Sequence, residues 1–179
     1  MKYRAIYSIE SKLAFNGLIL KVNNSPYIET LRLLDDKLHV NGKYYSTGKS
    51  SAIIDFKDGT PLKIVEDNSF SLLEQILSKF SFITRSHIKI RSLILIFDIS
   101  QNTLVRWFRQ YENIPSLVEA SRSVTDPEIL TVLERDEFQS SSPKINRAIR
   151  WYWKGLNEKD PLDAFLNFWI GLESINVSV

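Results

Sequence analysis

Apolar and polar residues alternate along the start of this chain, and a period of two is typical of a half-buried β-strand. The apolar members are Tyr3, Ala5, Tyr7 and Ile9. The stretch from Leu18 to Val22 repeats the pattern. Three pairs of residues that tolerate the positive φ of a tight turn interrupt the first hundred residues, at Asn16-Gly17, Asn41-Gly42 and Asp58-Gly59. This part of the chain is therefore expected to fold mainly as antiparallel strands.

The second turn signal predicts a hairpin, because residues 37–40 and 43–46 flank Asn41-Gly42 as two short strands. Residues 52–56 and 62–65 flank the third signal in the same way, with Pro61 at a strand start. The stretch from Tyr27 to Leu34 fits either a strand or a helix. Residues 88–99 are apolar on both faces in their second half, which is typical of a central strand.

Helical spacing begins with Phe70, Leu73, Leu77 and Phe80, and Ser71-x-x-Glu74 matches a capping box. Residues 103–111 and 126–136 are two further candidate helices. The stretch from Gln139 to Pro143 is the best linker. Beyond it, residues 145–156 and 161–172 predict two helices, the second with a buried stripe of Leu162, Phe165, Leu166, Trp169 and Leu172.

These patterns predict an α+β fold. A β-rich, mixed and largely antiparallel domain with packed helices would occupy residues 1–139. An α-helical hairpin would follow over residues 143–179.

Composition excludes several classes of protein. The chain has 179 residues, a formal net charge of +2 and no cysteine, so a disulfide framework or a cysteine-ligated zinc site is impossible. The longest apolar run is residues 93–97, whereas spanning a membrane takes about twenty residues. No signal-peptide apolar region follows Met1. A cytoplasmic protein without a membrane partner is expected.

Residues that could carry out chemistry are few. Gly48-Lys49-Ser50 matches the last three residues of the phosphate-binding-loop motif G-x-x-x-x-G-K-[ST]. However, Lys43 occupies the position of the first glycine, and a strand pattern follows. We interpret this segment as a loop between strands. His39 and His87 lack metal-ligand spacing, and each is interpreted as a residue on a strand surface. No catalytic residue, metal or cofactor is therefore predicted.

Basic residues cluster on the first C-terminal helix. They are Lys144, Arg147, Arg150 and Lys154, and no acidic residue occurs between Lys144 and Glu158. Lys144, Arg147 and Lys154 share one helix face with Trp151, and aromatic residues beside basic ones suit stacked bases and phosphates. RNA binding through these four basic residues is one hypothesis. A tryptophan on a helix more often anchors a core or an interface.

Residues 144–175 resemble the opening two helices of a HEPN domain. The resemblance lies in Arg147-Ala148-Ile149-x-Trp151, in the Asp160-Pro161 helix start, and in Trp169-x-x-Leu172-Glu173-x-Ile175. HEPN domains are helical and commonly pair into dimers, and many act in RNA cleavage within toxin–antitoxin or antiviral systems. Glu173 matches a recurrent acidic position of the family, and we interpret it as a structural or interface carboxylate.

The nuclease members carry an arginine followed by a histidine near the start of a late helix, which here would lie beyond Val179. Arg32 and His39, with six residues between them, have the spacing of such a pair. They lie in the strand-like part of the chain, and we interpret the match as chance. The leading hypothesis is a non-catalytic, HEPN-like interaction module from a nucleic-acid-associated or defence-type protein. Two alternatives are an RNA-processing nuclease whose catalytic half lies beyond Val179 and a small-molecule-binding β domain.

The predicted partner of the module is a second copy of the chain, with RNA or another protein as further possibilities. The two C-terminal helices carry more aromatic residues than one antiparallel pair can bury, and an exposed apolar patch usually marks an interface. The residues expected in this interface are Trp151, Trp153, Phe168 and Trp169, with Trp169 contributing most.

Overall fold

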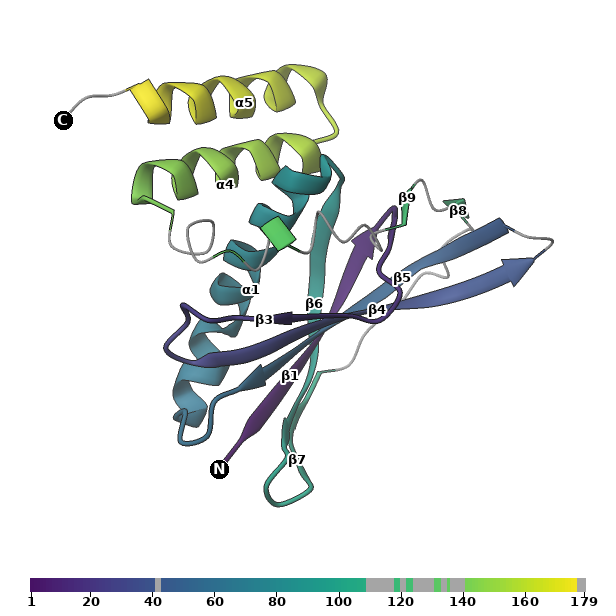
Figure 1. Ribbon diagram of the computed structural model, residues 1–179, viewed down its shortest axis with the longest axis vertical. Coiled ribbons are helices and arrows are strands. Elements are labelled where there is room, and N and C mark those ends of the chain that lie inside the picture. The colour runs from purple at the N-terminus through teal and green to yellow at the C-terminus, as the bar shows by residue number, and fades with distance from the viewer. Residues whose placement is uncertain are drawn as a thin grey trace.

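A computed structural model describes residues 1–40, 43–108, 118–119, 122–123, 131–132, 135 and 141–176. For residues 36–40, 43–49, 118–119, 122–123 and 176 it describes the backbone alone. The chain forms a twisted sheet with a long helix against one face, and a pair of helices stacks beside that helix (Figure 1).

Among the described residues, one sheet of seven strands has the order β3-β4-β5-β1-β6-β7, and β8 pairs with β5. These strands are β1 (Tyr3–Ser11), β3 (Leu18–Lys21), β4 (Ile28–Val40), β5 (Lys43–Phe56), β6 (Ile88–Asp98), β7 (Thr103–Trp107) and β8 (Val118–Glu119). All of their pairings are antiparallel. Two short strands, β2 (Leu13–Ala14) and β9 (Arg122–Ser123), form a separate parallel pair. The fold is α+β, as the sequence predicts.

The alternation in β1 is confirmed, since every second residue from Tyr3 to Ser11 is buried. This buried side meets α1 (Leu62–Thr84), which lies across one face of the sheet (Figure 1). The core includes Ile9, Leu33 and Phe56 from the sheet and Leu77 and Phe80 from the helix. Tyr27–Leu34, ambiguous in the sequence, is mostly strand β4, which begins at Ile28.

The start of α1 differs from the prediction. Residues 62–65 form the first turn of the helix instead of a strand, and Ser71-x-x-Glu74 lies inside the helix instead of capping it. Proline fixes φ near the helical value, and Pro61 (φ −63°) is the N-cap, so it starts the helix directly after the turn at Gly59 (φ +80°). Arg85 ends the helix in the left-handed conformation.

The predicted helix over residues 103–111 is also wrong where the structure describes it. Residues 103–107 form strand β7, in which Thr103 pairs with Asp98 of β6. The carboxylate of Asp98 accepts hydrogen bonds from the backbone N–H groups of Ser100 and Gln101, and Asn102 adopts φ +53°. These turn residues reverse the chain into a hairpin, and none of them lies within residues 103–111.

The hairpin predicted at residues 37–46 is confirmed by its register, in which Val40 pairs with Lys43 and Lys37 with Ser46. Its turn, Asn41-Gly42, lies outside the described residues. Gly48-Lys49-Ser50 is part of strand β5 and not a loop between strands. The helix predicted over residues 126–136 lies outside the described residues apart from 131–132 and 135.

The two C-terminal helices are confirmed as α4 (Pro143–Asn157) and α5 (Pro161–Asn176). Ser142 caps α4 by accepting a hydrogen bond from Ile145 N–H, and Asp160 Oδ1 accepts one from Leu162 N–H at 2.8 Å. Three contacts tie α4 to the rest of the fold. Trp153 Nε1 donates to the Ile88 carbonyl at 2.7 Å, Arg150 pairs with Glu74, and His87 Nδ1 lies 3.2 Å from the Leu156 carbonyl oxygen. The helix pair therefore packs against α1 and β6 through α4.

Candidate functional site

The side of α5 that faces α4 is built for close approach. A Cβ atom at Gly171 would lie 3.2 Å from the Ala148 carbonyl oxygen, and one at Gly155 would lie 2.6 Å from Cδ1 of Phe168. Small residues at these two positions let the backbones of the helices come together. Because the space between the helices is already filled, the larger apolar side chains of α5 must lie elsewhere.

Those larger side chains lie on the opposite side of α5, which we call the outer face. It consists of Leu162, Phe165, Leu166, Trp169 and Leu172, and each is between 45% and 66% exposed. Their spacing is that of one helical stripe. The sequence predicted that this stripe would be buried, and that prediction is wrong, because α5 packs on α4 through Phe168 and Gly171 instead.

Aromatic rings link α5 to the other two helices. Phe82 of α1 packs edge-on against Tyr152 of α4, with ring centroids 5.3 Å apart, and Tyr152 lies 5.4 Å from Phe168 of α5. Phe165 and Trp169 stack on the outer face itself at 6.4 Å. Since Phe82 is 44% exposed, aromatic side chains reach the surface on both α1 and α5.

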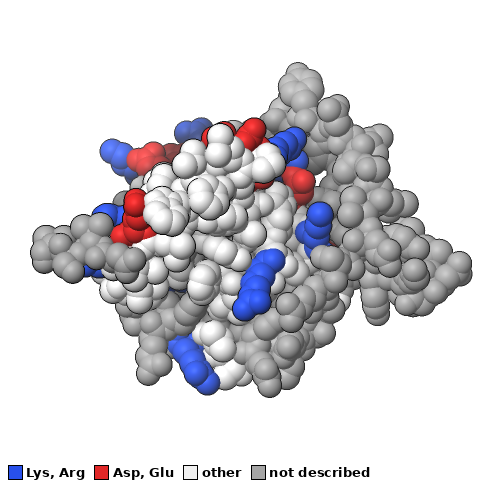
Figure 2. Space-filling view, turned by 90° about the horizontal axis from the view of Figure 1, so that it is seen from above, with Lys and Arg blue, Asp and Glu red and all other residues white. Residues whose placement is uncertain are grey.

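Polar groups border the apolar surface. Seen from above the helix pair, a broad uncharged area is flanked by acidic and basic side chains (Figure 2). Trp169 Nε1 donates a hydrogen bond to Glu173 Oε1 at 2.8 Å, so the polar edge of this indole is satisfied within the helix. Glu173, matched to the HEPN acidic position, therefore holds the Trp169 ring in place. An apolar centre with a polar rim is the usual composition of a protein–protein interface.

The four residues predicted to form the interface lie in different environments in the structure. Trp169 is 51% exposed and lies on the outer face, whereas Trp153 is 8% exposed and anchors α4 on β6. The assignment of Trp153 to an interface is therefore corrected, because its side chain belongs to the interior of the chain. Phe168 is half-buried between the helices, and Trp151 is half-buried beneath the ammonium group of Lys154, which lies 4.2 Å from its ring centroid.

The four basic residues predicted to bind RNA do not form one site. Arg150 points to α1, where it pairs with the buried carboxylate of Glu74. Lys154 packs over Trp151. Lys144 and Arg147 are exposed on the same flank of α4 as Lys154. The structure thus gives Arg150 an intramolecular role and leaves three basic side chains on one helix flank.

The histidines offer no catalytic arrangement in the part of the chain described. His87 contacts the Leu156 carbonyl, and its Nε2 lies 3.9 Å from Glu10. His39 lies in β4, and its side chain is outside the described atoms. Arg32, the other half of the chance Arg–His string, pairs with Asp55 at 3.0 Å. Among the described residues no cluster of three His, Cys, Asp or Glu side chains could hold a metal ion.

Comparisons with known proteins do not identify the chain. No protein-family model matches it, and neither a curated protein nor a solved structure does so. The HEPN resemblance therefore rests on residues 144–175 alone. None of the described helices is long and apolar enough to cross a membrane.

Sequence reasoning missed four members of the outer face. Leu162, Phe165, Leu166 and Leu172 were assigned to the interior, although Trp169 on the same stripe was assigned to an interface. The signal that distinguishes the two sides of α5 is Gly171, which shares a helix face with Ala164 and Phe168 and not with Trp169. A glycine at a helix contact permits close packing, so its side should have been taken as the inner one.

Proposed function

We propose that the chain is a non-catalytic interaction module that pairs with a second copy of itself through the outer face of α5. The observation that carries this proposal is the stripe of five large apolar side chains that the chain leaves half-exposed. Monomeric soluble proteins rarely expose a contiguous apolar patch larger than a few hundred Å², and larger ones mark interaction sites.

The size of the surface suits a dimer. Five half-exposed large side chains, with Ile170 beside them, present on the order of several hundred Å² of apolar surface. In a standard interface each partner contributes about 800 Å². A second α5 laid along the first would cover most of the exposed stripe and bring the aromatic pair Phe165–Trp169 to the centre.

The spacing of the apolar residues supports a partner of the same sequence. The outer face runs from Leu162 to Leu172, so its midpoint along the helix is at Asn167. Leu162 and Leu172 are equally far from this point, and so are Phe165 and Trp169. Reversing the helix therefore places apolar residues opposite apolar residues. A two-fold interface requires this kind of self-complementarity. If one residue of the first copy contacts a second residue of its partner, then that second residue of the first copy contacts the first residue of the partner.

The HEPN resemblance adds support of a different kind. Members of that family commonly pair into dimers, and residues 144–175 carry the resemblance. On the same ground we propose that the module belongs to a nucleic-acid-associated or defence-type protein. This wider role adds no residue to the interface.

Sedimentation equilibrium on the full chain at micromolar concentration tests the proposal. We expect a monomer–dimer equilibrium that Trp169→Ala weakens by about 30-fold or more in Kd, because a central aromatic anchor contributes roughly 2 kcal/mol or more. Trp107→Ala is the matched control, since Trp107 is 67% exposed on β7 and outside the outer face. A monomer at all concentrations, or equal weakening by both variants, would overturn the proposal.

A further inference from the structure

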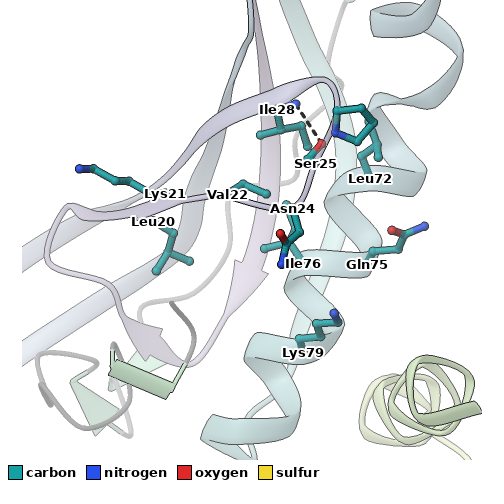
Figure 3. A pocket seen from close by; sticks show the side chains of 11 residues that line it. Leu20, Lys21, Val22, Asn24, Ser25, Ile28, Leu72, Gln75, Ile76 and Lys79 are labelled. Carbon is teal, nitrogen blue, oxygen red and sulfur yellow. Dashed lines mark hydrogen bonds between the residues drawn. The ribbon is translucent and has the colours of Figure 1, made fainter. Parts of the chain in front are cut away.

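A pocket of about 140 Å³ lies between the β3–β4 loop and α1 (Figure 3). Its wall is mostly apolar and is formed by Leu20, Val22, Pro26, Ile28, Leu72 and Ile76. Cavities of this size are large enough for a small ring, since an engineered apolar cavity of about 150 Å³ binds benzene. The pocket is separate from the outer face of α5, none of whose residues line it.

Polar groups lie among the apolar ones. Gln75 and Lys79 line the pocket from α1, and Asn24 lines it from the loop opposite (Figure 3). Burial lowers the pKa of Lys79, because the charged ammonium loses part of its hydration. An anion bound beside Lys79 would favour its charged form.

The loop side of the pocket is held in place by its own hydrogen bonds. Ser25 Oγ accepts from the N–H groups of Ile28 at 2.9 Å and Tyr27 at 3.3 Å, and the Ser25 carbonyl accepts from Lys57 Nζ at 2.7 Å. Val22 N–H donates to the Glu29 carbonyl at 3.1 Å. A wall fixed in this way has little conformational freedom to lose when a ligand binds.

We propose that this pocket binds a small organic carboxylate whose apolar body is about the size of a benzene ring, with its carboxylate against Lys79. The apolar wall contacts the apolar body of the ligand. Lys79 orients the ligand by pairing with its carboxylate, and so selects for a negative charge. Small-ligand sites commonly combine a mostly apolar lining with a few placed polar groups.

Titration of the full chain with benzoate, followed by two-dimensional amide NMR, tests the proposal. We expect saturable shifts confined to residues 20–28 and 72–79. Lys79→Met should weaken binding by about tenfold or more, whereas Lys79→Arg keeps the charge and should retain most of it. Lys63→Met, which removes an exposed lysine of the same helix, should leave the affinity unchanged.

Benzyl alcohol, which has the same ring without the charge, should bind at least tenfold more weakly than benzoate. Absence of saturable shifts with benzoate would overturn the proposal. So would equal affinities of the wild-type and Lys79→Met proteins, provided that the amide spectrum shows the variant to be folded. Shifts that map to α5 or to the rest of the sheet would place the binding elsewhere and also overturn it.

Discussion

Gly155 of α4 lies directly beneath the ring of Phe168 of α5, so close that a Cβ atom on residue 155 would overlap that ring. This relationship sets the spacing of the two helices. It also fixes which side of α5 turns inward, and so leaves Trp169 and its neighbours on the outside.

Gly155→Ala is expected to lower the free energy of unfolding by about 1–2 kcal/mol. Overpacking costs about 1–3 kcal/mol, and the better helix propensity of alanine returns up to about 1 kcal/mol. At Gly171 a Cβ atom would meet its nearest neighbour at 3.2 Å, so Gly171→Ala should be close to neutral. Urea denaturation of both variants measures the difference, and a larger loss for Gly171→Ala would show that the contact at Gly155 does not control the packing.

Mutation of Trp153 should lower the stability of the folded chain, whereas mutation of Trp169 should leave it almost unchanged. Trp153→Phe removes the hydrogen bond to the Ile88 carbonyl and part of a buried ring, which should cost about 1–3 kcal/mol of folding free energy. Trp169→Phe should change the stability of the dilute monomer by less than about 0.5 kcal/mol, as surface substitutions usually do. Thermal unfolding at low concentration separates the two. Comparable losses would show that Trp169 also belongs to the core.

Arg150 should matter for stability and not for RNA. Its guanidinium pairs with Glu74, whose carboxylate is buried, while the arginine itself is half-exposed. Arg150→Gln leaves that carboxylate without its ion pair and should cost about 1–2 kcal/mol, after allowance for solvent around the arginine. Arg147→Gln, on an exposed site of the same helix, should change stability by less than about 0.5 kcal/mol. Equal effects in denaturant titrations would refute this role.

Stability should decline at alkaline pH because of Tyr7. Its hydroxyl lies 2.5 Å from Ser69 Oγ between β1 and α1, and burial raises its pKa above the ordinary value of 10.0. A raised pKa in the folded state means that the unfolded chain loses the proton first. The contribution is therefore present in full below pH 10 and is lost as the pH rises through the folded-state pKa.

Tyr7→Phe cannot ionise, so its stability should fall less steeply than that of the wild type above pH 10. Chemical denaturation at a series of pH values gives both slopes. Identical slopes would mean that the Tyr7 hydroxyl is not the group responsible.

The sequence predicts the β-rich half well where the signal is local. The period-two pattern of β1 and the positive φ values at Asn16, Gly17 and Gly59 are confirmed, because alternation and positive φ are properties of a few neighbouring residues. The turn at Gly59 leads into a helix, however, and not into the second strand of a predicted hairpin. Besides the loop predicted at Gly48-Lys49-Ser50, the errors fall at Leu62 and Thr103, where strand and helix patterns compete over short windows. At those places a proline and an Asp–Asn turn decided the outcome.

The candidate sites depend on contacts that a sequence pattern does not contain. α5 carries apolar residues on two sides. Periodicity therefore predicts a helix but does not say which of the two sides faces α4. The pocket beside Lys79 joins residues about fifty positions apart, and it exists because the β3–β4 loop lies against α1. The excess of aromatic residues on the two helices predicted an interface role for Trp153, but its partner, the Ile88 carbonyl, belongs to a strand far away in the chain.

The pairing of α5 with a second α5 is tested most directly by disulfide cross-linking. The chain has no cysteine, so each introduced thiol is the only one present. In an antiparallel pair of outer faces centred on Asn167, residue 162 of one copy lies opposite residue 172 of the other. Leu162→Cys and Leu172→Cys proteins, mixed under mild oxidation, should cross-link mainly to each other, and Ser71→Cys, on the exposed side of α1, should cross-link little. Self-cross-linking of each variant at the expense of the mixed product, or yields no higher than that of Ser71→Cys, would contradict the antiparallel dimer.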